Sequence, residues 1–188
     1  MRVFLAVPCG EQLTARVTTA LDEWRSGPAG NLAVRWTRPE TWHLTLQFLG
    51  DWPADRLTQL QSAMEAAQDQ SAFFLTPGRI GGYPDLKRPR VLFLHMDDDG
   101  QVARLAGSVR AIVNKTWRQG PQDNRAFGAH LTLARIRARL SRSDINLLQE
   151  LKLEGMPDVA VEGFSLMASE LLPEGSRYTE LAFYGLRK

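Results

Sequence analysis

Two short stretches of the chain share the sequence His-Leu-Thr-Leu, one beginning at His43 and the other at His130, and together they use two of the three histidines. In both stretches polar and apolar residues alternate strictly, which is the pattern of a half-buried β-strand. On such a strand the histidine and the threonine point to one face, and the two leucines point to the other. We therefore predict two strands that hold His43 with Thr45, and His130 with Thr132, out of the core.

Two histidines that meet in one site could act as a base and an acid, because imidazole is the only side chain whose unperturbed pKa, about 6.5, lies near neutral pH. In-line displacement at phosphorus needs a base that activates the attacking oxygen and an acid that protonates the leaving oxygen. Each such proton transfer typically contributes about 10²–10⁴-fold in rate. The threonine hydroxyls could donate to phosphate oxygens. The motifs therefore predict a phosphoryl-transfer site without a metal, and they do not show which histidine is the acid.

Other catalytic sites have little support in the sequence. It contains no His-Glu-x-x-His and only one cysteine, Cys9, so the common zinc-binding patterns are missing. It also contains no Gly-x-Ser-x-Gly nucleophile elbow and no phosphate-binding loop of the P-loop type. The third histidine, His95, has no matching copy, and we expect it to be a structural residue.

The bulk composition is that of an ordinary soluble domain. Hydrophobic residues make up 44% and charged residues 23% of the 188 residues, which is enough chain for one domain with a sizeable core. The formal net charge of +2 permits a phosphate-bearing substrate and argues against wholesale coating of nucleic acid. The single cysteine and the short apolar run at 3–7, which stops at Pro8, predict a cytoplasmic protein without a membrane partner.

The hydrophobic pattern predicts strands interleaved with about four helices. We expect strands at 2–7, 31–36, 43–50, 72–75, 91–94, 129–135, 159–167 and 178–186. Helices are expected around Leu13, Val17, Leu21 and Trp24; around Leu57, Leu60, Met64 and Ala67, with Asp51 as a possible N-cap; from Val102 to about Trp117; and after Ser143-Asp144. Breaks are expected at Pro77 and Gly78, 81–84, 97–100, 120–125 and 173–175.

Several of these strands follow one another without a helix between them, so a doubly wound parallel sheet is not expected. We predict an α+β fold with two antiparallel or mixed sheets flanked by about four helices. The two motifs lie 87 residues apart, close to half the chain length. That spacing predicts a single bilobal domain over 1–188, in which two duplicated lobes each contribute one motif strand to a central cleft.

Beyond the motifs, the segments 2–7, 35–50, 88–94, 129–135 and 169–178 resemble the two-histidine (2H) phosphoesterase superfamily, over nearly the whole chain. Within it they are most similar to bacterial RNA 2',3'-cyclic phosphodiesterases, historically called 2'-5' RNA ligases. The resemblance implies a bilobal α+β fold that hydrolyses 2',3'-cyclic phosphate RNA ends to 2'-phosphomonoesters without metal or cofactor. Reversible 2'-5' ligation is the same chemistry with an RNA 5'-hydroxyl in place of water.

The resemblance also assigns the two roles. It implies that His43 donates a proton to the departing 3' oxygen and that His130 accepts one from water. The expected partner is RNA with cyclic phosphate ends, such as tRNA fragments or oligonucleotides, and we expect a monomer.

Phe48 and Arg135 occupy the same position relative to their histidines but differ in type. In the family the arginine of the second motif belongs to the substrate site; a guanidinium suits a phosphate oxygen and an aromatic ring suits a base. Strict alternation would place both on the face opposite the histidines, so a bulge or a strand end must re-aim them, or they are partly structural. Further substrate-binding candidates are Arg90, Tyr178 and Tyr83, and the run Arg137, Arg139 and Arg142 could form an RNA-backbone rim or a solvated edge.

Two other functions remain open from the sequence. The same chemistry could act on cyclic phosphates of small nucleotides or of ADP-ribose, in which case mononucleotides would react as well as oligonucleotides. The chain could also be a non-catalytic RNA-binding domain of the same fold, in which case replacing His43 would leave function intact.

Overall fold

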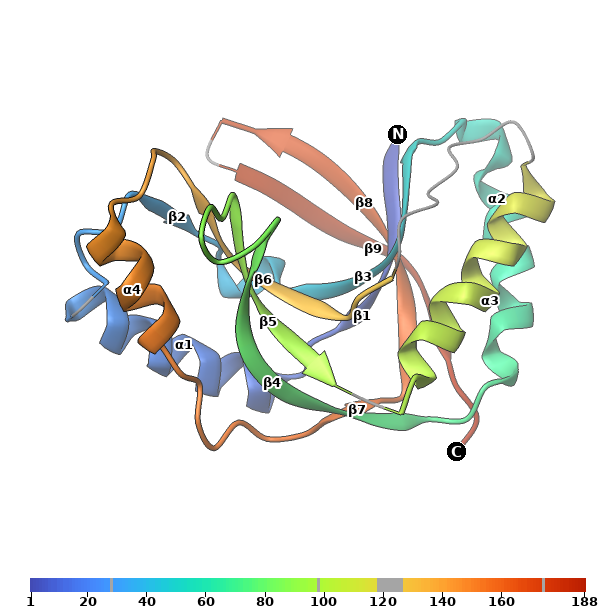
Figure 1. Ribbon diagram of the computed structural model, residues 1–188. Helices are drawn as coiled ribbons and strands as arrows, with labels where there is room; N and C mark the ends of the chain where they lie inside the picture. The colour runs from blue at the N-terminus through green and yellow to red at the C-terminus, as the bar shows by residue number, and fades with distance from the viewer. Residues whose placement is uncertain (28, 98, 118–126, 174) are drawn as a thin grey trace.

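The computed structural model describes residues 1–27, 29–97, 99–117, 127–173 and 175–188, and Figure 1 shows how its strands and helices are arranged. The strands are β1 (Arg2–Pro8), β2 (Val34–Trp36), β3 (His43–Asp51), β4 (Phe73–Tyr83), β5 (Val91–Asp97), β6 (His130–Ile136), β7 (Val159–Val161), β8 (Gly163–Leu172) and β9 (Gly175–Gly185). The helices are α1 (Glu11–Ser26), α2 (Leu57–Met64), α3 (Gln101–Thr116) and α4 (Arg142–Glu150), with short 3-10 turns η1 (Pro39–Thr41), η2 (Ala54–Arg56) and η3 (Glu65–Asp69).

The strands form one curled path in the order β7-β4-β5-β6-β3-β1-β8-β9, with β2 paired to β6, and the pairings described are antiparallel. The predicted α+β fold is confirmed. Instead of two separate sheets, the two halves join in the middle, where β3 pairs with β6 through Leu44 and Leu131. The two motif strands are therefore neighbours at the centre of the sheet.

The order of strands is nearly symmetric about this junction. We call β1, β3, β8 and β9 the His43 half, and β2, β4, β5, β6 and β7 the His130 half. In the first half β1 lies beside the motif strand and β8 beyond it; in the second β5 and β4 hold the corresponding places. The spacing of 87 residues that separates the histidines also separates Leu5 on β1 from Leu92 on β5. The halves are therefore equivalent in their central strands.

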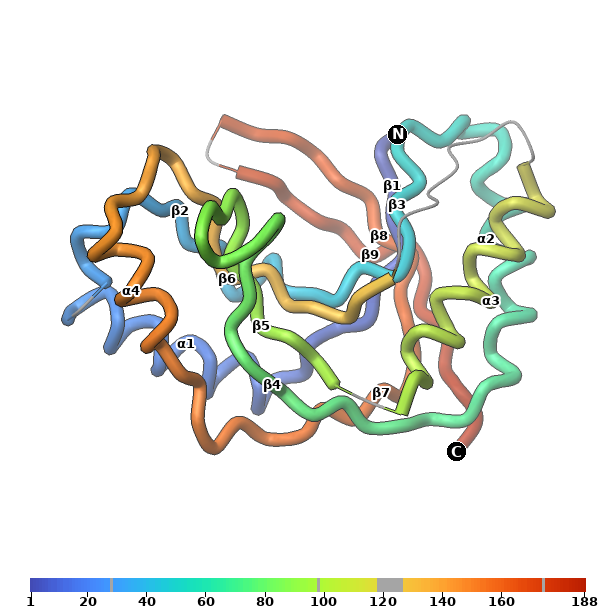
Figure 2. Tube along the Cα trace, in the orientation of Figure 1, coloured from blue at the N-terminus to red at the C-terminus, as the bar shows by residue number. Residues whose placement is uncertain are grey.

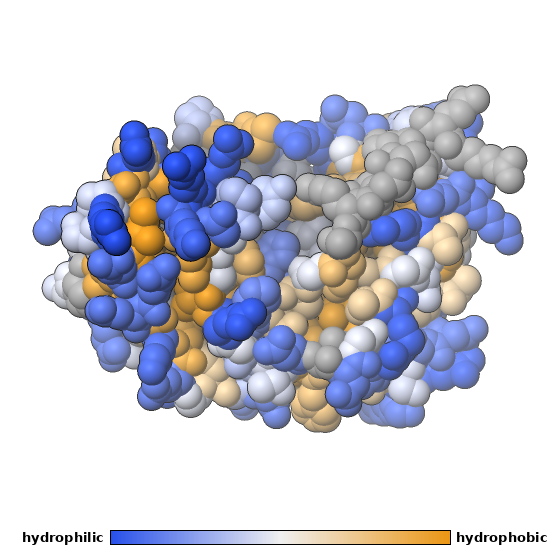
Figure 3. All heavy atoms as spheres, in the orientation of Figure 1, coloured by the Kyte–Doolittle hydropathy of each residue, from blue (hydrophilic) through white to orange (hydrophobic). Residues whose placement is uncertain are grey.

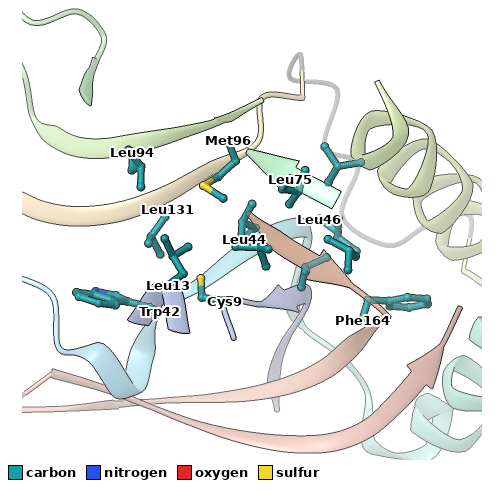
Figure 4. Packing of buried hydrophobic residues seen from close by; sticks show 14 of the residues in the cluster. Cys9, Leu13, Trp42, Leu44, Leu46, Leu75, Leu94, Met96, Leu131 and Phe164 are labelled. Atoms are coloured by element: carbon teal, nitrogen blue, oxygen red, sulfur yellow. The ribbon is translucent and has the colours of Figure 1, made fainter. Parts of the chain in front are cut away.

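The helices lie at the two ends of the molecule, α1 and α4 at one and α2 and α3 at the other, as the chain trace in Figure 2 also shows. Helix α1 buries the four predicted residues, Leu13, Val17, Leu21 and Trp24, and α3 packs against α2 and β3. In Figure 4 the side chains of Leu44, Leu131 and Trp42 lie together in the core beneath the motif strands. The alternation of the motifs is thus satisfied, with the leucines buried. In the space-filling view of Figure 3, hydrophilic side chains dominate the surface, and apolar ones remain visible between the helical end at the left and the strands.

Strand β4 corrects one prediction. It continues through Pro77, Gly78 and the pair Gly81-Gly82, where a break and a loop were expected. Its pairing with β5 shifts between Pro77 and Ile80, so the extra residues form a bulge. A bulge accommodates a proline without ending the strand.

Three element ends also differ from the sequence predictions. Asp51 is the last residue of β3, not an N-cap, and α2 starts after η2. Helix α4 is capped by Ser141 rather than Ser143, in a capping box with Asp144. The expected strand 159–167 is two strands, because β7 pairs with β4 whereas β8 pairs with β1 and β9. The predicted loop 120–125, and residues 98 and 174 of the two predicted turns, lie outside the described residues. Among the described helices, none is long and apolar enough to cross a membrane.

Candidate active site

The backbone aims the two histidines in the same way. Nδ1 of His43 lies 2.7 Å from the carbonyl oxygen of Thr41, and Nδ1 of His130 lies 2.7 Å from that of Gly128. A carbonyl oxygen can only accept, so Nδ1 carries the hydrogen in both rings and donates it. In the neutral ring Nε2 is then left with its lone pair, which makes it the atom available to a substrate.

The junction between β3 and β6 brings the two motifs together. Antiparallel pairing at Leu44 and Leu131 sets His43 across from Thr132, and Thr45 across from His130, on the face opposite the leucines. Both threonines are half-buried. The two imidazoles are close enough for the charge of His130 to lower the pKa of His43. Two histidines and two threonines thus surround one point from two sides.

A bulge in each motif strand re-aims the residue that follows it. Leu5 of β1 pairs with Gln47 of β3, and the next residue, Ala6, pairs with Thr45. Leu46 of β3 is therefore the extra residue of the bulge. In the same way, Leu92 of β5 pairs with Ala134 of β6, and Phe93 pairs with Thr132. The extra residue on β6 is Leu133, which is equivalent to Leu46.

After each bulge the order of buried and exposed residues changes phase. Phe48, which is 51% exposed, and Arg135, also exposed, therefore come to the face of the histidines. Strict alternation would have put both on the other face, so the predicted bulge is present on both strands.

Thr37 ties the two motifs together, and the sequence did not single it out. Its hydroxyl lies 2.8 Å from the carbonyl oxygens of Thr132 and Leu133, at the bulge of β6, and its backbone N–H donates to Leu133 over 2.9 Å. The buried indole of Trp42, directly before His43, donates to the same hydroxyl over 2.8 Å. The segment entering the first motif is therefore bonded to the second.

His43 lies among aromatic rings. Its ring centroid is 4.7 Å from that of Phe4 and 5.1 Å from that of Tyr178, and Phe4 also approaches Phe48 at 6.1 Å. Burial is the main cause that lowers the pKa of His43; the bond to Thr41 acts in the opposite direction, and the charge of His130 adds to the lowering. Free His43 is therefore mostly neutral at pH 7. Tyr178 and Phe48 therefore lie on the side of the site that holds His43, and their contact with a substrate remains a prediction.

His130 is exposed and has more polar neighbours. The ring of Phe93 lies 5.1 Å from His130 and 4.9 Å from His95, the residue directly opposite His130 on β5. Arg135 lies farther along β6, opposite Arg35 of β2. His95 therefore lies on the face of the site, beside His130, where the sequence had predicted only a structural residue. Period-two alternation along β5, with Leu92, Leu94 and Met96 buried, could have revealed this.

The remaining candidates lie at the margin. Arg90 precedes β5, where its backbone N–H donates to Tyr83 and its carbonyl accepts from Ile136; within the described part of the chain, no hydrogen bond joins its side chain to a motif residue. Tyr83 is 66% exposed at the end of β4. Arg137, Arg139 and Arg142 are exposed, as a rim or a solvated edge would require.

Two surface hollows lie away from this face. One of about 260 Å³ is formed by α1 and residues 152–156, and one of about 370 Å³ by α2 and β9; neither contains a motif residue. In the described residues, no three of His, Cys, Asp and Glu are grouped as metal ligands. The absence of metal from the reaction remains a prediction.

Known proteins share both the sequence and the fold. Residues 13–93 match the family described as LigT like Phosphoesterase. An RNA 2',3'-cyclic phosphodiesterase of Thermus thermophilus is 31% identical over 100% of this chain and 91% of its own length. The chain belongs to the LigT-like phosphoesterase family. The resemblance inferred from the two motifs is thereby confirmed.

Other LigT-like proteins extend the match over the whole fold. An RNA 2',3'-cyclic phosphodiesterase of Archaeoglobus fulgidus is 29% identical, covering 98% of this chain and 99% of its own. The crystal structure of TT0787 of Thermus thermophilus superposes with a TM-score of 0.80 at 30% identity, covering 100% of this chain and 98% of that one. That of E. coli LigT complexed with 3'-AMP gives 0.80 at 26% identity, with the same coverage.

Proposed function

We propose that this protein hydrolyses 2',3'-cyclic phosphate ends of RNA to 2'-phosphomonoesters, with His43 and His130 as acid and base and without a metal. The observation that carries the proposal is the pairing of the two motifs about Leu44 and Leu131, which sets two identically bonded imidazoles on one face. The names of the curated relatives supply the substrate class. The E. coli relative complexed with 3'-AMP further supports a nucleotide ligand.

The proposed reaction is one in-line displacement. Nε2 of His130 takes a proton from water, whose oxygen attacks phosphorus opposite the 3' oxygen. The P–O3' bond breaks, and Nε2–H of His43 gives its proton to O3', which leaves the phosphate on O2'. Thr45 and Thr132 donate hydroxyl hydrogen bonds to the non-bridging oxygens. Exchange of protons with solvent then restores both rings.

This assignment requires His43 to be protonated, although its surroundings favour the neutral ring in the free protein. A phosphate anion at Nε2 favours the charged imidazolium and so raises the pKa of His43 when substrate binds. Substrate binding would thus favour protonation of His43, the proposed acid. Arg135 would contact a phosphate oxygen, while Phe48 and Tyr178 would offer their rings to the base of the terminal nucleoside. Arg90 is a weaker candidate, since its side chain has no described hydrogen bond at the site.

We further propose that the chain acts as one bilobal domain and a monomer, because each half contributes one histidine and Thr37 bonds the two motifs to each other. The substrate would be an oligonucleotide or a tRNA fragment. From the family resemblance we also propose 2'-5' ligation, which is the reverse of the cleavage of a 2'-5' linkage by the same two histidines. We propose a cytoplasmic location for the same RNA-processing role.

The test uses a short RNA with a 2',3'-cyclic phosphate end, in EDTA, with phosphorus NMR of the product for wild type, His43→Ala and His130→Ala. We expect a 2'-phosphate from wild type and a loss of about 10²–10⁴-fold in each variant. Phe183→Ala serves as a control, because Phe183 is an exposed residue of β9 in the hollow beside α2.

Each contrary outcome selects a different account. A 3'-phosphate product would contradict the assigned leaving oxygen, and inhibition by EDTA would contradict the metal-free scheme. Turnover of 2',3'-cyclic mononucleotides without turnover of RNA would favour the small-nucleotide alternative. RNA binding that survives in both variants, with no turnover by wild type, would favour the non-catalytic alternative.

A further inference from the structure

The face of the site extends past His130 onto β5 and β4, where it presents side chains that the hydrolysis does not use. His95 is the direct partner of His130 across β5 and β6, and the ring of Phe93 lies about equally far from both, at 4.9 and 5.1 Å. Phe93 and His95 are half-buried, so one surface of each remains accessible.

The bulge of β4 adds Arg79 to this group. Pairing runs from Pro77 with Met96 to Ile80 with Leu94, so that Gly78 and Arg79 together lie opposite His95. The exposed guanidinium of Arg79 is close enough to lower the pKa of His95. Bulges beside active sites commonly re-aim a side chain in this way.

Gly81 leaves room for the rings of Phe93 and His95. It pairs with Phe93, and a Cβ on Gly81 would lie 3.0 Å from Nε2 of His95 and against the ring of Phe93. Any larger residue would displace both rings. The two rings therefore lie over a glycine and beside His130, with their planes at 78° to each other.

His95 differs from the two catalytic histidines in its bonding. Within the described residues its ring has no hydrogen-bond partner, whereas His43 and His130 each donate Nδ1–H to a carbonyl. Burial, Arg79 and His130 lower its pKa against the opposing effect of Asp97, which leaves the ring neutral at pH 7. A half-buried imidazole with both nitrogens uncommitted is suited to a ligand.

The charges indicate which kind of ligand fits. The formal charges of Arg79 and Asp97 offset each other beside the neutral His95, so this group does not favour an anion as Arg135 does. Flat rings next to donors and acceptors match a nucleobase, which stacks on aromatic or histidine rings and is hydrogen-bonded at its edge.

We infer that Phe93, His95 and Arg79 form a second nucleobase subsite, for the nucleoside whose 5' oxygen leaves or attacks when a 2'-5' linkage is cleaved or formed. The inference rests on the proposed function, because it takes His130 as the residue that handles the oxygen opposite O3'. The nucleoside attached to that oxygen must then lie on the His130 side. The first nucleoside would use Phe48 and Tyr178 in the other half.

The step balances without a co-reactant. In cleavage, His43 takes the proton of the 3'-hydroxyl, O3' attacks phosphorus, and the P–O5' bond breaks while His130 gives a proton to O5'. The products are a 2',3'-cyclic phosphate and a nucleoside with a free 5'-hydroxyl. Ligation is the same step reversed.

The test compares two substrates in parallel, adenylyl-(2'→5')-adenosine, which contains the second base, and 2',3'-cyclic AMP, which lacks it. His95→Ala and Phe93→Leu should lower kcat/KM for cleavage of the dinucleotide by about 5- to 150-fold, mainly through KM, as expected for a lost base stack. Hydrolysis of the cyclic nucleotide should change less than about 3-fold. His95→Gln, which retains a polar edge, should lose less than His95→Ala. Phe183→Ala should change neither substrate.

Equal losses on both substrates would overturn the inference, because His95 would then act on His130 rather than on a base. No loss on either, or a wild type that hydrolyses cyclic AMP but does not cleave the dinucleotide, would overturn it and leave the proposed function intact. A wild type inactive on both would overturn both. Should the variants not fold, adenosine titrated into the wild-type protein must shift the His95 Cε1–H resonance, and an unmoved resonance would overturn the subsite.

Discussion

Strands β3 and β6 carry the same motif, the same 2.7 Å bond from the histidine Nδ1 to a carbonyl two residues earlier, and the same skipped leucine after the threonine. Their surroundings differ. His43 is half-buried among Phe4 and Tyr178, whereas His130 is exposed beside Phe93 and His95. The backbone contacts that orient the imidazole are thus alike in both halves, whereas the side chains around the imidazole differ.

That difference supports the opposite roles that we propose for the two histidines. Burial lowers the pKa of His43, and a substrate phosphate beside the ring would favour its protonated form. His130 faces solvent, where water is available as the nucleophile. The asymmetry lies mainly in residues outside the motifs, such as Phe4 against Val91 and Phe48 against Arg135, each pair again 87 residues apart.

The largest expected effect is on the junction that the two halves share. Leu44 and Leu131 are fully buried, and truncating either to alanine should lower the free energy of unfolding by about 2–5 kcal/mol. Urea denaturation followed by tryptophan fluorescence measures the loss. The exposed Leu171→Ala should change stability by less than about 0.5 kcal/mol. A large loss for only one of the two leucines would contradict their equivalence.

Thr37→Val tests the connection between the motifs at nearly constant volume. The variant leaves the buried indole N–H of Trp42 without its partner and removes the hydroxyl bond to Thr132 and Leu133. We expect a loss of about 1–3 kcal/mol in unfolding free energy, together with a lower kcat. Thr37→Ser should restore both. A Val variant with unchanged kcat would show that the connection serves stability alone.

Phe48 and Arg135 should fail in different ways. Phe48→Ala should raise KM for RNA with little dependence on salt, whereas Arg135→Gln, which removes the charge, should raise KM more at low than at high ionic strength, because salt screens the attraction to phosphate that this variant lacks. Each loss should be about 10-fold, on the scale of one hydrogen bond to a charged group. Measuring KM of both variants at two salt concentrations tests this difference. Equal salt dependence would contradict the division into an aromatic and a basic half.

The smallest effect concerns pH. The rate should follow a bell-shaped profile, and in kcat/KM, which reports the free enzyme, the limb set by His43 should lie below pH 6.5 because its pKa is lowered. In kcat, which reports the complex, the same limb should move to higher pH as the bound phosphate favours the protonated ring. Rates between about pH 5 and 8 measure both. If the limb set by His43 lies at the same pH in kcat and in kcat/KM, substrate binding does not favour the protonation of His43.

The sequence could predict whatever depends on local periodicity. The faces of α1 and α3, the strands with alternating leucines and the two motifs follow from spacing alone, and the duplication identified both histidines. Pro77 and Gly78 led to a wrong prediction of a strand end, because proline and glycine also occur at bulges. Only the pairing with β5 reveals the bulge. Thr37, Phe4 and Arg79 were missed because their roles arise from contacts with residues far away in the chain.

The proposed mechanism depends on His43 as the acid and His130 as the base. The most direct measurement uses a 2',3'-cyclic substrate with sulfur in place of the bridging 3' oxygen, because a thiolate leaves without a proton. His43→Ala should recover most of its activity on this substrate, whereas His130→Ala should remain about 10²–10⁴-fold below wild type. Recovery by His130→Ala instead would reverse the assignment, and recovery by neither would contradict acid catalysis at the 3' position.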